Sequence, residues 1–247
     1  MNACCDPEPA PALALLAGGL ATRLRPLTET IPKSLVAVAG EPFIAHQMRL
    51  LGREGIARVV ICVGHLGDRI EAFVGDGSRF GIRADYSRDG DRPLGTGGAL
   101  RRALPMLGKD FFVMYGDSYL DTNFAAVNAA FRRSAKSALM TVYRNAGRWD
   151  RSNVDYANGI VRRYDKSAPP GAMAYIDYGL GVISADALGA WPADAPFDLA
   201  AFYADLAGRG ELAGYEVFER FHEIGAPAGL AETEAYLARA GAERTRA

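Results

Sequence analysis

The sequence is poor in cysteine and has no excess of charge of one sign. Its 3 cysteines are the adjacent Cys4 and Cys5 and a separate Cys62, a spacing that excludes a zinc-finger pattern and a disulfide framework. Cys62 stands in an apolar run, so we expect a small core residue of a cytoplasmic protein. A formal net charge of -1 over 247 residues gives no basic footprint for nucleic acid, so a nucleic-acid partner is not expected.

Long hydrophobic runs are also missing. Because no apolar segment reaches the length that spans a bilayer, we expect no association with a membrane. The first ten residues carry acids and prolines without a basic start, which is not the pattern of a signal peptide. We expect residues 1–10 to be disordered and residues 1–247 to contain one domain.

Short apolar runs alternate with helical patterns over the first 150 residues. The expected strands are 12–18, 57–64, 82–87, 110–117 and 137–144, and the expected helices are 42–55, 66–75, 95–107 and 123–136. This alternation predicts an α/β fold with a doubly wound, mostly parallel, Rossmann-like sheet and helices on both faces.

The pattern changes after residue 150. Residues 153–166 form two short apolar runs joined by Asn158 and Gly159, which predicts a β-hairpin. The remaining elements are expected as an extended run at 172–184, a helix at 198–210, a strand at 212–219 and a closing helix at 227–240. The C-terminal half is therefore expected to add a small antiparallel part to the sheet.

The stretch "LLAGGLATRLRPLTETIPKSL", residues 15–35, indicates a phosphate-bearing ligand. It matches neither the P-loop nor the spaced-glycine fingerprint of dinucleotide-binding folds. Gly18 and Gly19 follow the first strand, where backbone N–H groups can approach a phosphate closely. Arg23 can bind phosphate oxygens in pairs, and Lys33 follows the restricting Pro32. The alternative is a glycine-rich surface turn with solvated cations.

Two further glycine and acidic clusters follow expected strands. The segment "RPLGTGGAL" places glycines before a helix, leaving room for a flat ring or a sugar, or else forming an ordinary helix start. Asp117 stands at the end of the strand expected at 110–117, where it could hold Mg²⁺ or form a turn. Glu223, in "RFHEIGAP", could meet Asp117 across the site, with His222 as the competing ligand.

Asp165 and Lys166 end the second strand of the hairpin. The lysine could bind a second phosphate and the carboxylate could accept from sugar hydroxyls. The alternative is a solvated charge pair at the end of a strand.

Taken together, these stretches resemble the sugar-1-phosphate nucleotidylyltransferases, or NDP-sugar pyrophosphorylases. The family signature stands here as "LAGGLATRLRPLT" followed by Pro32 and Lys33, with Ala21 where the family usually has Gly. Within the family, four segments resemble the heptose 1-phosphate and mannose 1-phosphate guanylyltransferases. They are "PLGTGGAL", "SNVDY", "YIDYGL" and "ERFHEIGAP". This resemblance implies a nucleotide-binding core at 11–150 and a sugar-phosphate-binding part at 151–247.

The resemblance also implies roles for single residues. Arg23 would hold the departing pyrophosphate, Lys33 would lie beside the α-phosphate, and Asp117 and Glu223 would bind Mg²⁺. The implied nucleotide-binding residues are Leu16, Ala17, Gly18, Gly19, Thr22, Gly95, Thr96 and Gly97. The implied sugar-phosphate-binding residues are Asp165, Lys166, Tyr178 and Gly179.

The implied reaction joins a nucleoside triphosphate, with GTP favoured, to a heptose-type or mannose-type sugar 1-phosphate for surface polysaccharide synthesis. The sugar phosphate is already anionic near neutral pH, so positioning and charge neutralisation suffice without a general base. Two alternatives stay open, a cytidylyl- or uridylyltransferase acting on another phosphorylated substrate and a catalytically silent regulatory protein. A homodimer is the candidate assembly, which the sequence does not decide.

Overall fold

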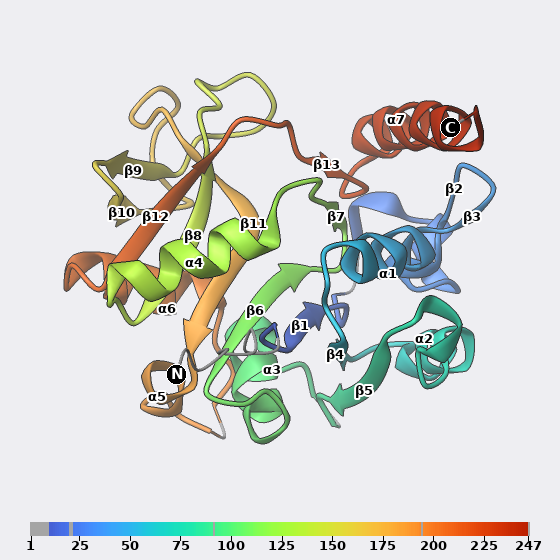
Figure 1. Ribbon diagram of the computed structural model, residues 1–247, viewed down its shortest axis with the longest axis horizontal. Helices are drawn as coiled ribbons and strands as arrows, with labels where there is room; N and C mark the ends of the chain where they lie inside the picture. Colours follow the sequence, from blue (N-terminus) through green and yellow to red (C-terminus); the bar gives the residue numbers. More distant parts are fainter. Residues whose placement is uncertain (1–9, 20–21, 91, 194, 247) are drawn as a thin grey trace, which may run out of the picture.

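The computed structural model describes residues 10–19, 22–90, 92–193 and 195–246. Disorder was predicted for residues 1–10, of which all but Ala10 lie outside this description. The effect of Ala21 and the role of the Thr22 side chain also concern parts outside it. Within the described ranges, the chain is built around one large sheet with helices on both of its faces (Figure 1).

The large sheet has nine strands in the order β5-β4-β1-β6-β11-β8-β12-β10-β9. Its strands are β1 (Leu13–Leu16), β4 (Arg58–Val63), β5 (Arg83–Arg88), β6 (Asp110–Tyr115), β8 (Ala138–Tyr143), β9 (Val154–Ala157), β10 (Ile160–Tyr164), β11 (Ile176–Ser184) and β12 (Leu212–Val217). The five strands expected in the first half and the four expected extended segments of the second half are therefore confirmed.

Most strands of this sheet run in one direction. β5, β4, β1 and β6 pair in parallel, and β12 pairs in parallel with β8. β11 lies between β6 and β8 and is antiparallel to both. The mostly parallel, doubly wound sheet is confirmed, while the separation of β6 from β8 by a strand from the second half was not predicted. β11 suits that place because nearly all its residues are buried, as a strand covered on both faces requires.

The helices divide between the two faces of the sheet. Leu13 and Leu15 of β1 pack with α1, α2 and α4, whereas Ala14 packs with α3, α5 and α6. The alternation follows from the strand period of two residues. The helices are α1 (Phe43–Arg53), α2 (Gly67–Val74), α3 (Gly95–Ala103), α4 (Phe124–Ser134), α5 (Ala185–Gly189), α6 (Leu199–Gly208) and α7 (Pro227–Arg246), with short 3-10 turns at Thr22–Leu24, Leu27–Glu29, Lys33–Leu35, Ser78–Phe80 and Leu104–Met106.

Local signals in the sequence set several boundaries. The side chain of Asn123 accepts a hydrogen bond from Ala126 N at 2.8 Å and so caps α4. Gly55, at φ +78°, ends the α1 turn as expected of a C-terminal glycine. Asn158 and Gly159 both have positive φ, which is the geometry of a two-residue hairpin turn between β9 and β10.

Two small sheets lie beside the large one, and the second of them connects the C-terminal segment to the first half of the chain. β2 (Ala37–Val38) pairs with β3 (Glu41–Pro42), and β13 (His222–Glu223) pairs with β7 (Ser118–Tyr119). α7 packs on this region through Leu237, which shares a buried cluster with Phe43 and Ile224. The chain that carries Glu223 is thereby fixed beside the end of β6 (Figure 1).

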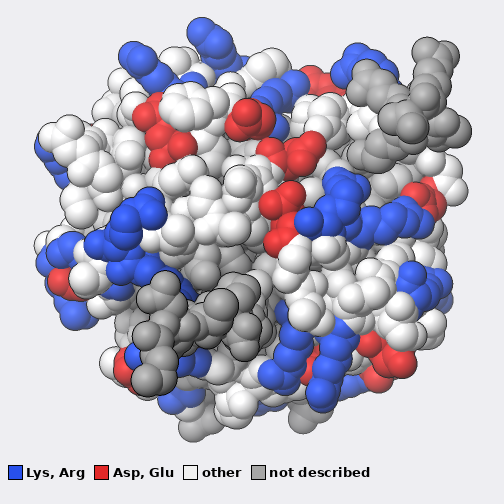
Figure 2. Space-filling view, viewed as in Figure 1, with Lys and Arg blue, Asp and Glu red and all other residues white. Residues whose placement is uncertain are grey.

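The charged side chains of both signs are interspersed on the face that Figure 2 shows. That face carries no large field of positive charge, in keeping with the near-neutral net charge. None of the helices among the described residues has the length and apolar character that crossing a membrane requires.

Candidate functional site

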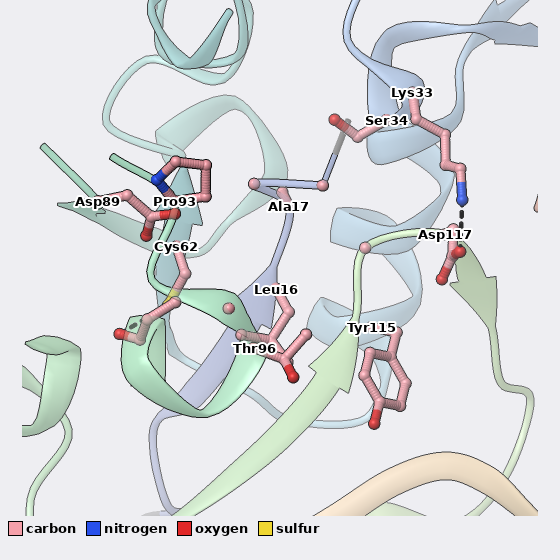
Figure 3. A pocket seen from close by; sticks show the side chains of 15 residues that line it. Leu16, Ala17, Lys33, Ser34, Cys62, Asp89, Pro93, Thr96, Tyr115 and Asp117 are labelled. Atoms are coloured by element: carbon pink, nitrogen blue, oxygen red, sulfur yellow. Dashed lines mark hydrogen bonds and ion pairs between the residues drawn. The ribbon is translucent and has the colours of Figure 1, made fainter. Parts of the chain in front are cut away.

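A cavity of about 270 Å³ opens at the carboxyl ends of the parallel strands β1, β4 and β6. This is the edge at which open α/β sheets bind ligands. The cavity is lined by Leu16, Ala17, Gly18, Gly19, Lys33, Ser34, Cys62, Asp89, Pro93, Gly95, Thr96, Ala99, Tyr115, Gly116 and Asp117. Figure 3 shows Lys33 and Asp117 at one end and Asp89 and Pro93 at the other, with Ala17 between them.

Lys33 and Asp117 form an ion pair at the first of these ends. Lys33 Nζ donates to Asp117 Oδ2 at 2.6 Å, and both side chains are partly buried (Figure 3). The lysine begins a short 3-10 turn directly after Pro32. Asp117 follows β6 as the sequence predicted. The Lys33 ammonium and the Asp117 carboxylate are therefore held together at the end of β6. The segment at residues 15–35, which we expect to bind phosphate, meets β6 there.

Glu223 is brought to Asp117 by backbone pairing. In the β13–β7 pair, Glu223 stands opposite Ser118, and Ile224 N donates to Asp117 O at 2.9 Å. Burial and the Asp117 charge together raise the pKa of the Glu223 carboxyl. Two carboxylates that repel one another gain from a cation placed between them.

This pair fits Mg²⁺, which prefers one or two carboxylates together with phosphate and water oxygens. Among the described residues no group of three or more His, Cys, Asp and Glu side chains is arranged to hold a metal ion. The protein part of such a site would therefore be Asp117 and Glu223, with the remaining oxygens coming from substrate and water.

His222 faces away from this pair. Its ring stacks on Tyr236 of α7 at a centroid distance of 3.9 Å, and burial lowers its pKa to about 4. Because neighbouring residues of a strand point to opposite faces, His222 and Glu223 diverge. His222 is a packing residue here.

Arg23 lies on the same side of the site as Glu223. Its Nη2 atom is close to Gly225, where an added Cβ would meet it at 3.2 Å. The guanidinium is exposed and is not among the groups that line the cavity. It therefore stands at the rim, beside the two carboxylates.

A second cavity of about 200 Å³ adjoins the first and shares Tyr115 and Asp117 with it. Its other lining residues are Ser118, Asp150, Asn153, Tyr164, Lys166, Ile176, Asp177, Tyr178, Gly179, Phe221 and Glu223. Lys166, Tyr178 and Gly179 were predicted to lie together, and the structure brings them into one cavity. The Tyr115 and Tyr178 hydroxyls are buried without a hydrogen-bond partner among the described residues.

Asp165 is placed differently from the other predicted residues. Its carboxylate accepts from Ser167 N and Oγ at 2.8 and 2.6 Å and from Arg163 at 2.7 Å, and it lines neither cavity. Among the carboxylates that line the second cavity is that of Asp177, which accepts from Gly179 N at 2.9 Å and from the Tyr164 hydroxyl at 3.3 Å. Burial raises the pKa of Asp177.

The glycines of the "GTGG" segment have a structural reason that the sequence did not reveal. An added Cβ on Gly97 would lie 2.1 Å from Phe197 Cε2, so the space expected for a ligand is filled by that ring. Gly97 N also donates to Phe197 O at 3.0 Å. The Thr96 hydroxyl donates to Asp198 Oδ1 at 3.1 Å and accepts from Leu199 N at 2.8 Å. Thr96 and Gly95 still line the first cavity, but this packing locks the start of α3 to the start of α6.

Several lining residues were missed by sequence reasoning. Asp89 follows β5 directly, so the rule about the carboxyl ends of parallel strands could have found it. Asp150 and Asn153 come from the loop between β8 and β9 and carry no such signal. Asp177 stood inside a quoted segment without being singled out.

Comparison with known proteins places this chain in a family. The family described as "Nucleotidyl transferase" matches residues 13–154, more than half of the chain. N-acetylmuramate alpha-1-phosphate uridylyltransferase of Neisseria meningitidis is 42% identical over 113 residues, covering 45% of this chain and 49% of that protein. Mannose-1-phosphate guanyltransferase of Gibberella zeae is 38% identical over 124 residues, covering 49% of this chain and 34% of that protein.

Solved structures extend the likeness over most of the fold. HddC from Yersinia pseudotuberculosis has a TM-score of 0.78 at 22% identity, covering 92% of this chain and 99% of that one. A protein of Bacillus anthracis named "Putative Glucose-1-Phosphate Thymidylyltransferase" has a TM-score of 0.80 at 22% identity. The likeness covers 92% of this chain and 95% of that one. The chain spans less than half the length of the curated relatives it matches first. On the match over residues 13–154, the chain belongs to the nucleotidyl transferase family.

Proposed function

We propose that this protein joins a nucleoside triphosphate to a sugar 1-phosphate, forming an NDP-sugar and releasing pyrophosphate. The observation that carries the proposal is the pair of adjoining cavities that share Tyr115 and Asp117, with Lys33 at their junction. Two substrates bound in neighbouring cavities would meet at that junction. The related proteins named above include a uridylyltransferase and a guanyltransferase of sugar 1-phosphates.

The chemistry follows from the charges at the junction. An oxygen of the sugar phosphate attacks the α-phosphorus, the bond between the α-phosphorus and the bridging oxygen breaks, and pyrophosphate leaves with that oxygen. Lys33 would hold the α-phosphate, and Arg23, at the rim, would bind the pyrophosphate. Mg²⁺ bound by Asp117 and Glu223 would supply positive charge to the phosphate oxygens. Positioning and charge neutralisation carry such a reaction without a general base.

The second cavity would hold the sugar phosphate. Lys166 would bind its phosphate as a point charge, while Asp177 would bind ring hydroxyls. We propose GTP and a heptose-type or mannose-type sugar 1-phosphate as the preferred pair, and surface polysaccharide synthesis as the setting. This preference rests on the segments "PLGTGGAL", "SNVDY", "YIDYGL" and "ERFHEIGAP".

A substrate panel tests the proposal. Pyrophosphate release is measured with GTP, UTP, dTTP, CTP and ATP, each combined with heptose, mannose, glucose and N-acetylmuramic acid 1-phosphates. Release that requires both substrates supports the reaction, and highest activity with GTP supports the preferred base. No release with any pair would favour the silent regulatory protein, whereas activity with CTP or UTP on another phosphorylated substrate would favour the other alternative.

The predicted role of Asp165 is tested in the same assay. Lys166→Ala should raise the apparent KM for sugar phosphate far more than the KM for the triphosphate, because it removes a charge from the second cavity only. Asp177→Asn should change the ranking among sugars. If Asp165→Asn changes that ranking and Asp177→Asn does not, the assignment of Asp177 is wrong and the original prediction for Asp165 stands.

A further inference from the structure

Lys33 is paired with a residue that the proposed reaction assigns to the metal ion. Its ammonium donates to Asp117 Oδ2 at 2.6 Å, and the two side chains are only 18% and 27% exposed (Figure 3). The other carboxylate oxygen, Oδ1, accepts from the Ser118 hydroxyl at a long 3.4 Å. Asp117 therefore already has a cation of the chain itself against one of the two oxygens that a metal ion would use.

The Lys33 charge also reaches the second carboxylate of the metal pair. Burial and the charges of Asp117 and Asp150 raise the pKa of the Glu223 carboxyl. The charges of Arg23 and Lys33 act on Glu223 in the opposite direction, so both cations lie near it. Because Lys33 partly neutralises both carboxylates, they attract a divalent cation less strongly than a bare pair of carboxylates would.

A triphosphate changes this balance, because it offers the ammonium a new anionic partner. Lys33 lines the first cavity, where the α-phosphate is expected. Its backbone is fixed by the turn after Pro32, in which Val36 N donates to Lys33 O at 3.1 Å. The four-carbon stem of a lysine is flexible, so the ammonium can turn from Asp117 to a phosphate oxygen while the backbone stays in place.

The lysine of the second cavity is held less closely. Lys166 Nζ lies 3.5 Å from Asp198 Oδ1, and both of these side chains are more exposed than those of the Lys33 pair. An exposed ion pair of this kind contributes little, and Asp198 is not one of the two carboxylates assigned to the metal ion. The close pairing is therefore a particular feature of Lys33 and Asp117.

We propose that Lys33 is the counter-ion of Asp117 in the nucleotide-free protein and keeps a divalent cation out until the triphosphate draws the ammonium away. This inference rests on the proposed function of the two cavities. Lys33 and a divalent cation compete for the same carboxylate, and their charges repel one another at this short range. The metal ion and the triphosphate are therefore expected to bind together.

The test measures Mn²⁺ binding to the full-length, nucleotide-free protein by electron paramagnetic resonance, which detects the free ion. Mn²⁺ is a suitable probe because it shares the preference of Mg²⁺ for carboxylate and water oxygens. Lys33→Met keeps the approximate length of the side chain and removes its charge. This variant should bind Mn²⁺ at least about tenfold more tightly than the wild type, since one neighbouring charge shifts an ionic equilibrium by about one to three powers of ten. Lys33→Arg keeps the charge and should keep the weak affinity.

Three further variants make the measurement specific. Lys33→Met/Asp117→Asn should lose the gain in affinity, because the ligand itself is missing. Lys136→Met is the matched control, since it removes the same charge from a pair with Glu211 at 3.6 Å, away from both cavities, and it should keep the wild-type affinity. Lys33→Gln repeats the loss of charge with a polar side chain, and it replaces Lys33→Met if that variant does not fold.

A Mn²⁺ affinity that neither Lys33→Met nor Lys33→Gln raises overturns the inference. A gain that Lys136→Met shares, or that survives Asp117→Asn, overturns it as well. Pyrophosphate release by the wild type in the substrate panel is measured in parallel. Release together with an unchanged Mn²⁺ affinity removes this inference alone, whereas no release with any pair removes the proposed function and the role of the triphosphate with it.

Discussion

Lys33 is the residue on which the proposed reaction depends most, through its ammonium group. Lys33→Ala should lower the turnover number about 10²- to 10³-fold, because it removes a charge aimed at the transferred phosphoryl group. The fold should persist, since a partly exposed ion pair contributes about 0–1 kcal/mol, and the melting temperature should change by at most about 4 °C. Pyrophosphate release and thermal melting measure the two effects.

Lys136→Ala is the matched control, because Lys136 pairs with Glu211 at 3.6 Å, away from both cavities. It should leave turnover unchanged. A Lys33→Ala enzyme with near-normal turnover would contradict the assignment.

The carboxylates of Asp117 and Glu223 give a second prediction at this scale. Asp117→Asn and Glu223→Gln should each raise the Mg²⁺ concentration needed for half-maximal pyrophosphate release, and Asp117→Asn should be the more damaging. Without metal, Glu223→Gln should not lower the melting temperature. Because the pKa of Glu223 is raised in the folded protein, folding disfavours its charged form. The resulting loss of stability grows as the pH rises above the pKa of the unfolded chain, and glutamine removes it because it carries no charge.

His222→Asn serves as the control for the metal site, because its ring packs on Tyr236. An unchanged Mg²⁺ requirement in Glu223→Gln, together with a raised one in His222→Asn, would show that the ligands are misassigned.

At the scale of elements, the start of α3 is locked to the segment before α6 by contact between Gly97 and Phe197. Gly97→Ala should destabilise the fold by about 1–3 kcal/mol, because its Cβ would lie 2.1 Å from the Phe197 ring. The double variant Gly97→Ala/Phe197→Ala should be less destabilised than the sum of the two single variants. Urea unfolding of the four proteins measures this coupling.

Gly189→Ala is the matched control, since the nearest atom to its added Cβ, Leu104 Cδ2, is 3.8 Å away. Its free energy of unfolding should not fall. Strictly additive effects of the Gly97 and Phe197 variants would mean that contact with the Phe197 ring is not the cause of the destabilisation.

At the scale of the whole molecule, β11 joins the two halves of the chain. It pairs with β6 from the first half along one edge and with β8 along the other. Because removing β11 would expose the buried strands on both sides, we predict one cooperative unfolding transition. Far-ultraviolet circular dichroism and tryptophan fluorescence should give coincident melting curves. Two separated transitions would show that residues 11–150 and 151–247 fold as independent units.

Much of the fold could be predicted because its signals are local. The apolar run of β1, the Asn123 cap and the Asn158–Gly159 turn each depend on residues close in sequence, and all three are confirmed. Among the site residues, Lys33 and Asp117 could be found for the same reason, since each directly follows a proline or a strand that the sequence marks.

The remaining features depend on contacts between distant segments. Nothing near Gly97 in the sequence indicates that Phe197 fills the space beside it, and nothing near Asp165 indicates that Ser167 and Arg163 occupy its carboxylate while Asp177 enters the cavity. The sequence by itself determined the period of each element, its caps and the residue types that suit phosphate. The tertiary structure decided that β11 separates β6 from β8 and which carboxylates face the cavities, because strand order and side-chain direction follow from packing over the whole chain.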